Sequence, residues 1–280
     1  IVRAENQDRI AVLRGVDPNR RRYSIVALCD GMGGMTDGAI CGASSLASFM
    51  ASFIFWGAAT LTPSERLKRA AIDANRNVFE VYRSRGGATL SAVLIYEPKR
   101  FHWVNVGDSR IYHRSAEKFT QVTIDDTLEG QFPHADGAEG RNQLLQFIGV
   151  GPELEAHTGI VEYNEGDEIL LTSDGLHTID HSLIVEILAN SPEPAVGIKR
   201  LADLARWRGG HDNATGAMLF PADVARLMSS GPEDPDTIEI WDPYGELQIV
   251  QPKAPVIDQR RLKTSEDSSR SDDMAPGEGS

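Results

Sequence analysis

Several carboxylates stand next to short apolar runs, and they are the residues with the clearest capacity for chemistry. Asp30 and Asp174 each follow an apolar run directly and precede a glycine. Because strand ends are rigid, carboxylates placed there can converge at little conformational cost. Like charges brought together need a neutralising cation, so a hard divalent metal ion is the natural partner of these carboxylates. The set comprises Asp8, Asp30, Asp108, Asp174 and Asp212.

A turn is the competing interpretation for each of these positions taken singly, since Asp-Gly after a strand is ordinary turn chemistry. The repetition of the pattern favours a shared metal site. Glycine next to a ligand also lets the backbone approach closely, so the carbonyl of Gly31 is a further candidate ligand.

The elements that must position these aspartates are short strands alternating with a few helices. The tight link at 97–100 joins two of the strands and predicts antiparallel hairpins, which argues against a purely parallel α/β fold. Thr62 can cap a helix whose first residue is Pro63. The predicted strands are 23–29, 92–96, 102–106, 168–172 and 214–220, and the predicted helices are 40–56, 63–82 and 196–208.

The composition is that of a globular protein with a substantial core. The chain has 280 residues, 41% of them apolar and 25% charged, and a formal net charge of −13. It has no basic tract of the kind that binds nucleic acid. Cys29 and Cys41 lie in apolar surroundings without metal-finger spacing, which predicts buried thiols in a reducing, cytoplasmic compartment. The uncharged stretch 38–64 has an apolar stripe and a small polar face, which predicts a buried core helix and no membrane span.

The composition changes beyond Phe220, and this change sets the predicted domain boundaries. Residues 1–228 are predicted to form the catalytic domain, so a chain ending near residue 228 is expected to stay folded and active. Residues 229–236 form a linker, 237–263 a small β-hairpin extension, and 264–280 a disordered acidic tail.

Six motifs in order over about residues 1–220 resemble those of the metal-dependent protein phosphatases, also called type 2C serine/threonine phosphatases. The glycine-rich form after Asp30 is similar to the bacterial branch. The motifs are Arg3 with Glu5-Asn6-Gln7-Asp8, Asp30-Gly31-Met32-Gly33-Gly34, Gly87-Ala88-Thr89, Gly107-Asp108-Ser109-Arg110, Ser173-Asp174-Gly175 and Gly210-His211-Asp212-Asn213-Ala214-Thr215.

The resemblance implies an α+β fold, a four-layer α-β-β-α sandwich with two antiparallel sheets face to face and helices on both outer sides. It also implies two Mn²⁺ or Mg²⁺ ions. Asp30 would bridge the ions, Gly31 would lend its carbonyl to one, and Asp174 and Asp212 would complete the other.

The remaining roles complete the site that the resemblance implies. Asp8 would hold a water of the metal centre, Asp108 would serve a third, weaker metal site, and Arg3 would grip the substrate phosphate through its bidentate guanidinium. The implied activity is hydrolysis of phosphoserine and phosphothreonine in protein substrates, in signalling opposite a cognate serine/threonine kinase. The sequence does not indicate an oligomeric state.

This chain departs from the family pattern in three places. Met32 stands where many eukaryotic members carry a histidine proposed as the general acid, and Gln7 stands where an acidic residue is common. The segment 123–127 also differs from the usual Asp-His-Ser/Thr, and the following segment 128–142 is unfamiliar, so this region is predicted to shape substrate access.

Two other functions compete with the phosphatase. Ser109 and His177 could form a serine hydrolase pair, with Ser109 as the nucleophile and His177 as its base. That interpretation leaves Asp30 and Asp212 unexplained. The departures from the family pattern would also suit a phosphatase-fold binding or regulatory module with weak catalysis, although every carboxylate of the inner site is present.

Overall fold

The computed structural model describes residues 5–32, 38–132, 140, 142–210, 212–231, 233–234 and 237–247. These residues fall in a unit that runs from Ile1 to Ile249. The predicted acidic tail at 264–280 lies outside the described residues, as does the later part of the predicted hairpin.

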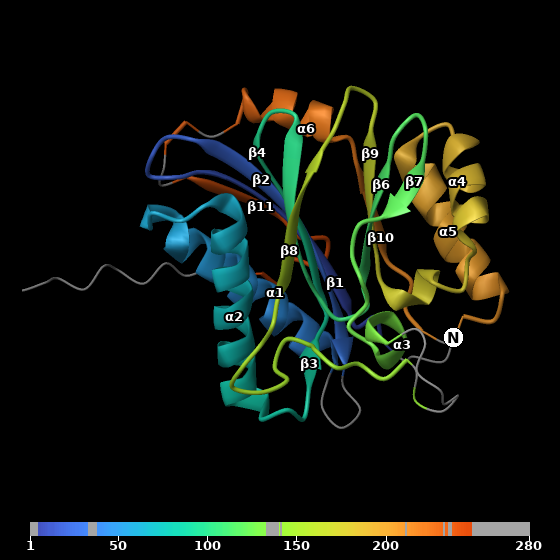
Figure 1. Ribbon diagram of the computed structural model, residues 1–280, viewed down its shortest axis with the longest axis horizontal. Helices are drawn as coiled ribbons and strands as arrows, with labels where there is room; N and C mark the ends of the chain where they lie inside the picture. The colour runs from blue at the N-terminus through green and yellow to red at the C-terminus, as the bar shows by residue number, and fades with distance from the viewer. Residues whose placement is uncertain are drawn as a thin grey trace, which may run out of the picture. The chain divides into compact units, whose positions relative to one another are not determined.

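Two antiparallel sheets form the centre of this unit (Figure 1). The larger sheet has the strand order β11-β1-β2-β4-β5-β8, with β3 also paired to β2, and the smaller has the order β10-β9-β6-β7. The larger sheet contains β1 (Asp8–Val16), β2 (Arg22–Met32), β3 (Gly87–Ala88), β4 (Leu90–Glu97), β5 (Arg100–Val106), β8 (His157–Glu162) and β11 (Ile238–Trp241). The smaller sheet contains β6 (Arg110–Arg114), β7 (Phe119–Gln121), β9 (Glu168–Thr172) and β10 (Gly216–Leu219).

Helices cover the outer face of each sheet, as Figure 1 shows for α2 beside the larger sheet and for α4 and α5 beside the smaller one. Helix α1 packs against α2 and against strands β1 and β2. The α-helices are α1 (Gly38–Phe55), α2 (Pro63–Tyr82), α3 (Leu128–Gln131), α4 (His181–Ala189), α5 (Pro194–Trp207) and α6 (Pro221–Met228), and two short 3₁₀ helices span Trp56–Ala58 (η1) and Asp174–Leu176 (η2).

Three layers of apolar side chains hold the four layers of secondary structure together. The first lies between the larger sheet and helices α1 and α2, and includes Phe49 and Phe53. The second lies between the two sheets and includes Phe101 and Ile169. The third lies between the smaller sheet and helices α4 and α5 and includes Leu201. Because successive side chains of a strand point to opposite faces of the sheet, one strand can contribute side chains to two of these layers.

The two long N-terminal helices form as the sequence predicts. Thr62 accepts a hydrogen bond from the backbone of Glu65, and the Glu65 carboxylate accepts one from the Thr62 backbone in return, so α2 begins with a capping box. Among the described residues, one helical stretch, Gly38–Ala58, is long and apolar enough to cross a membrane. Its large apolar side chains Phe49, Met50 and Phe53 are fully buried against the sheet and α2, as predicted for a core helix. Cys29 and Cys41 are buried and are not joined in a disulfide, as predicted.

The C-terminal part differs from the predicted boundary. Strand β11 pairs antiparallel with β1, from Val12 opposite Trp241 to Gly15 opposite Ile238, so it completes the main sheet. A boundary near residue 228 therefore cuts through one folded unit. Composition misled here because the polar segment at 229–236 is a connection within the unit. The second strand of the predicted hairpin falls partly on residues 248–250, outside the described residues, so the hairpin stays a prediction.

Candidate metal centre

Pairing of β1 with β2 brings the first two aspartates together. Asp8 begins β1, and its partner in the antiparallel register is Asp30 on β2. The sequence predicted Asp30 directly after a strand ending at residue 29, but Asp30 lies within the strand, because β2 continues to Met32 and pairs there with β3. Sheet register therefore sets the spacing of these two carboxylates.

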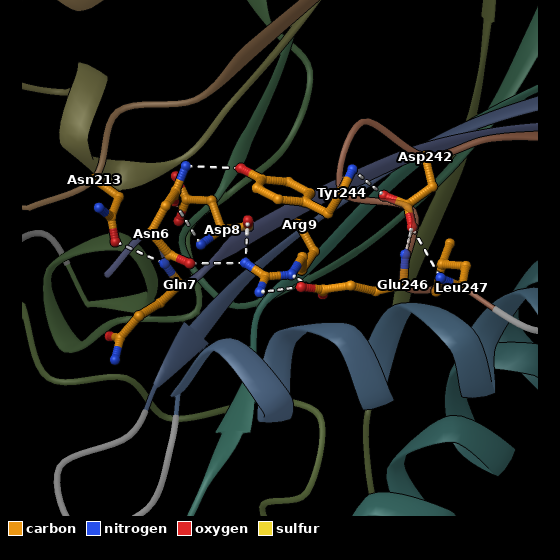
Figure 2. A network of polar contacts seen from close by, with 9 residues as sticks. All are labelled: Asn6, Gln7, Asp8, Arg9, Asn213, Asp242, Tyr244, Glu246 and Leu247. Carbon is orange, nitrogen blue, oxygen red and sulfur yellow. Dashed lines mark hydrogen bonds and ion pairs between the residues drawn. The ribbon is translucent and has the colours of Figure 1, made fainter. Parts of the chain in front are cut away.

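The smaller sheet supplies the next two aspartates from adjoining ends of β9 and β10. Asp174 opens η2 just after β9, and Asp212 precedes β10, which pairs with β9. A Cβ on Gly175 would lie 1.8 Å from the backbone oxygen of Asn213, so only glycine allows the two loops to approach this closely. The Gln7 N–H donates to Asn213 Oδ1 at 2.9 Å (Figure 2), which links these loops to the start of β1.

Asp8 is buried at this junction, with 1% of its surface exposed. Its Oδ2 accepts a hydrogen bond from Ser173 Oγ at 2.8 Å. Its Oδ1 is buried and has no hydrogen-bond partner within the described residues. A buried carboxylate oxygen without a donor is costly, and a cation or an ordered water is the kind of partner that satisfies it.

Two hydroxyl groups hold the backbone at Asp30. The Asp30 N–H donates to Thr89 Oγ1 at 3.0 Å, and the Thr89 N–H donates to the Asp30 carbonyl at 2.9 Å. Thr89 Oγ1 also lies 2.7 Å from Ser109 Oγ, and both side chains are buried. Thr89 and Ser109, from two of the motifs, thus support the backbone at Asp30.

The carboxylates act on one another through their charge. Burial raises the pKa of Asp30 well above its ordinary value, and repulsion from Asp8, Asp174, Asp108 and Asp212 raises it further. Burial is also the main reason that the pKa of Asp8 is raised. For Asp108, burial first and then the neighbouring Asp174 and Asp125 raise the pKa to about 7. The aspartates predicted from the sequence therefore share one electrostatic environment.

The donor set suits a hard divalent cation. Carboxylates and a backbone carbonyl are its preferred ligands, and the unsatisfied Asp8 oxygen lies among them. Within the described residues, no group of three or more His, Cys, Asp or Glu side chains is close enough to enclose an ion. Carboxylates repel one another, so drawing Asp30, Asp174 and Asp212 onto one point needs the charge of the cation itself.

The family model described as Protein phosphatase 2C matches residues 3–195. The chain belongs to the protein phosphatase 2C family. The predicted resemblance is thereby confirmed, and so is the predicted four-layer α+β fold, which this phosphatase shares with the solved structures of the family.

The chain is similar to named proteins from bacteria. A putative protein phosphatase 2C-type from Streptococcus pyogenes is 28% identical over 231 residues, covering 78% of this chain and 92% of the relative. The serine/threonine protein phosphatase PstP of Mycobacterium tuberculosis is 31% identical over 231 residues, covering 77% of this chain but 42% of PstP, so the match spans less than half of that protein.

A solved structure extends the comparison to metal binding in a relative. The crystal structure of the PstP catalytic domain in complex with two manganese ions has a TM-score of 0.60 and 28% identity, and the match covers 78% of this chain and 92% of that one.

A cavity of about 730 Å³ adjoins the candidate metal centre, and Asp108 and Asp174 both line it. Arg110 lies in its wall and forms a bidentate ion pair with Asp125, the shortest N–O distance being 2.7 Å. The pair fixes the unusual 123–127 segment against β6. The sequence indicated that this segment shapes access but not that Arg110 anchors it, since pairing between distant residues has no local signal.

His177 is a second cavity residue whose environment the sequence did not reveal. Burial, with the nearby Arg110 and His181 charges, lowers the pKa of His177 to about 3. The ring is therefore neutral at physiological pH and cannot supply the proton of a cationic general acid.

Some predicted site residues cannot be placed. Arg3, Gly33, Gly34 and His211 lie outside the described residues, so the role of Arg3 stays a prediction. Met32 ends β2 and pairs with Gly87.

The metal-free phosphatase should lose stability as the pH rises. Folding raises the pKa of Asp108 from 3.8 to about 7, so the folded state holds a proton that the unfolded state has lost between these values. The contribution of Asp108 to the free energy of unfolding is fully present below pH 3.8 and is lost as the pH rises to about 7. We expect the unfolding temperature in a chelator to fall by several degrees from pH 5 to pH 8. Saturating Mn²⁺ should reduce this decrease in unfolding temperature, and so should Asp108→Asn. A decrease of the same size in the variant would show that Asp108 is not its cause.

Proposed function

We propose that this chain hydrolyses phosphoserine and phosphothreonine in proteins, using two Mn²⁺ or Mg²⁺ ions held by the aspartate cluster. One observation carries the proposal. Strand pairing sets Asp8 opposite Asp30, and in the environment that these two share with Asp108, Asp174 and Asp212, burial and then repulsion from the other four carboxylates raise the pKa of Asp30. Membership of the protein phosphatase 2C family assigns this arrangement to phosphate ester hydrolysis.

Each residue of the proposed metal centre has its own role. Asp30 would be the shared ligand, with the Gly31 carbonyl for one ion and Asp174 and Asp212 for the other. Asp8 orders solvent through its buried carboxylate, and Asp108 serves a weaker third site beside the cavity. When bound, the ions supply Lewis acidity, neutralise phosphate charge and make hydroxide available near neutral pH.

Substrate would enter through the cavity beside Asp108 and Asp174. Its acidic lining includes Asp125 and Glu129, but the Asp125 charge is already compensated by Arg110. The Arg110 guanidinium is committed to that ion pair. The phosphate therefore needs another cationic group, which is the role proposed for Arg3.

The buried position of Ser109 does not support the serine hydrolase alternative. Its side chain is fully buried and hydrogen bonds to Thr89, which in turn receives the Asp30 N–H. A nucleophile needs access to its substrate, and this hydroxyl instead supports Thr89, which holds the backbone of Asp30. The structure does not favour the regulatory-module alternative, because the carboxylates of the proposed inner site share one electrostatic environment.

Phosphate release from phosphoserine and phosphothreonine peptides tests the proposal. We expect turnover to require Mn²⁺ or Mg²⁺, to fall at least about a hundredfold in excess EDTA, and to return when the metal is restored. A serine-directed phosphonylating inhibitor should leave the rate unchanged, because Ser109 is buried. Full activity in EDTA, or a trapped covalent phosphoenzyme, would exclude the proposed chemistry.

The cellular setting forms part of the same proposal. A cytoplasmic phosphoprotein, phosphorylated by a serine/threonine kinase, is the proposed substrate. The buried thiols of Cys29 and Cys41, which are not joined in a disulfide, are consistent with a reducing compartment.

A further inference from the structure

A short turn after β11 reaches the start of β1, where Asp8 lies (Figure 2). We call residues 242–247 the C-terminal clamp. Asp242 organises it, because its carboxylate accepts hydrogen bonds from the backbone N–H groups of Tyr244, Glu246 and Leu247 at 2.9, 2.7 and 2.9 Å. The clamp is therefore a defined structure that can present side chains in fixed positions.

The first arm of the clamp is the Tyr244 hydroxyl. It accepts a hydrogen bond from Asn6 Nδ2 at 2.8 Å. The same Asn6 amide uses its Oδ1 to accept the Asp8 backbone N–H at 3.0 Å. Tyr244 thus fixes the orientation of the amide that holds the backbone of Asp8 (Figure 2).

The second arm is Glu246, which acts through Arg9. Its carboxylate pairs with the Arg9 guanidinium at 2.7 Å and 3.3 Å. Arg9 Nη1 donates to the carbonyls of Asn6 and Asp8, at 2.7 and 3.0 Å. The guanidinium also lies 4.4 Å from the centre of the Tyr244 ring, in a cation–π contact. With 6% of its side chain exposed, Arg9 needs this compensation.

Both arms act on the main chain of Asp8, one on its N–H group and the other on its carbonyl group. The N–H of Asp8 is held through Asn6, and its carbonyl is held through Arg9. The Asp8 carboxylate is held separately by Ser173. The clamp lies beyond residues 3–195, which the family model matches.

We propose that the C-terminal clamp is a positioning element for the metal centre, with Tyr244 and Glu246 as its positioning residues. They hold the backbone at Asp8 so that its carboxylate meets Asp30 and the cations at the spacing that binding requires. The inference rests on the proposed function, since it assigns the clamp to that same site. Partners beyond the direct ligands usually tune metal affinity more than the chemical step.

Tyr244→Phe and Glu246→Gln test this positioning role. Each removes one arm while keeping nearly the same side-chain volume. We expect each to weaken Mn²⁺ binding to the metal-free protein about tenfold by calorimetry, with kcat at saturating Mn²⁺ within about twofold of wild type. Exchange of the Asp8 backbone amide with deuterium should quicken in the metal-free variants.

Glu239→Gln is the matched control. Glu239 pairs with Arg14 at 3.4 Å across the same two strands, farther along β1 from Asp8. Its variant should bind Mn²⁺ as wild type does. If all three variants bind Mn²⁺ equally, or if the clamp variants lose kcat with unchanged Mn²⁺ affinity, the positioning role is wrong.

The outcomes also separate the clamp from the proposed function. Wild-type protein that neither binds Mn²⁺ nor releases phosphate would overturn the proposed function and this inference with it. Wild-type protein that does both, with clamp variants indistinguishable from it, would overturn the clamp alone. Urea unfolding of each variant shows whether lost affinity merely follows lost stability.

Discussion

Asp30→Asn is expected to reduce metal-dependent phosphatase turnover by about a thousandfold or more. The substitution removes the charge that both cations would share while changing the side-chain volume little. Asp174→Asn and Asp212→Asn should have comparable effects, since each removes one charge from the other proposed ion. Initial rates on a phosphothreonine peptide at saturating Mn²⁺ provide the measurement.

The same substitution should not destabilise the metal-free protein. The Asp30 carboxylate is buried among like charges, which raises its pKa, so replacing it with a neutral amide relieves repulsion. We expect an unfolding temperature in EDTA equal to or above that of wild type near pH 8. Asp223→Asn, which alters a surface aspartate in α6 that pairs with Arg226, serves as the control and should change neither quantity. Near-normal turnover in Asp30→Asn would remove Asp30 from the metal centre.

The residue at which a truncated chain ends should determine both its free energy of unfolding and its affinity for metal. A chain ending at Met228 lacks β11 and the C-terminal clamp, which exposes the β1 edge and removes Ile238, Ile240 and Leu247 from the first core layer. We expect its free energy of unfolding to fall by about 3 kcal/mol or more. Exposed strand edges also promote association between chains.

A chain ending at Ile249 should keep the wild-type free energy of unfolding, since it retains the whole folded unit. Urea unfolding and light scattering on the two truncated chains provide the comparison. Equal stability of the two would restore the boundary near residue 228 that the composition predicts.

The sequence alone identified the parts of this fold that local chemistry encodes. Pro63–Tyr82 is helical over the whole predicted range, because Thr62, Pro63 and Glu65 form a start signal that acts within one turn. The strand Glu168–Thr172 also agrees, since its apolar run is bounded by polar residues on both sides. Strand β1 and helix α6 were not predicted, because neither has as clear a pattern.

The identity of the candidate metal ligands was also readable from the sequence. Asp30 and Asp174 carry a signal because an apolar run and a glycine flank each carboxylate. Their convergence was expected, but the means of convergence was not. The register that sets Asp8 opposite Asp30 is a property of the paired strands.

Only the tertiary structure decided what surrounds those carboxylates. The contacts of Arg110 with Asp125 and of Tyr244 with Asn6 join residues whose separation in the chain carries no periodic or motif signal. The C-terminal segment appeared to be an extension because its composition is polar and acidic. It joins the main sheet because β1 offers an unpaired edge, and backbone hydrogen bonding at an edge depends little on side-chain identity. Local sequence thus indicated the candidate metal ligands, and long-range pairing determined what surrounds them.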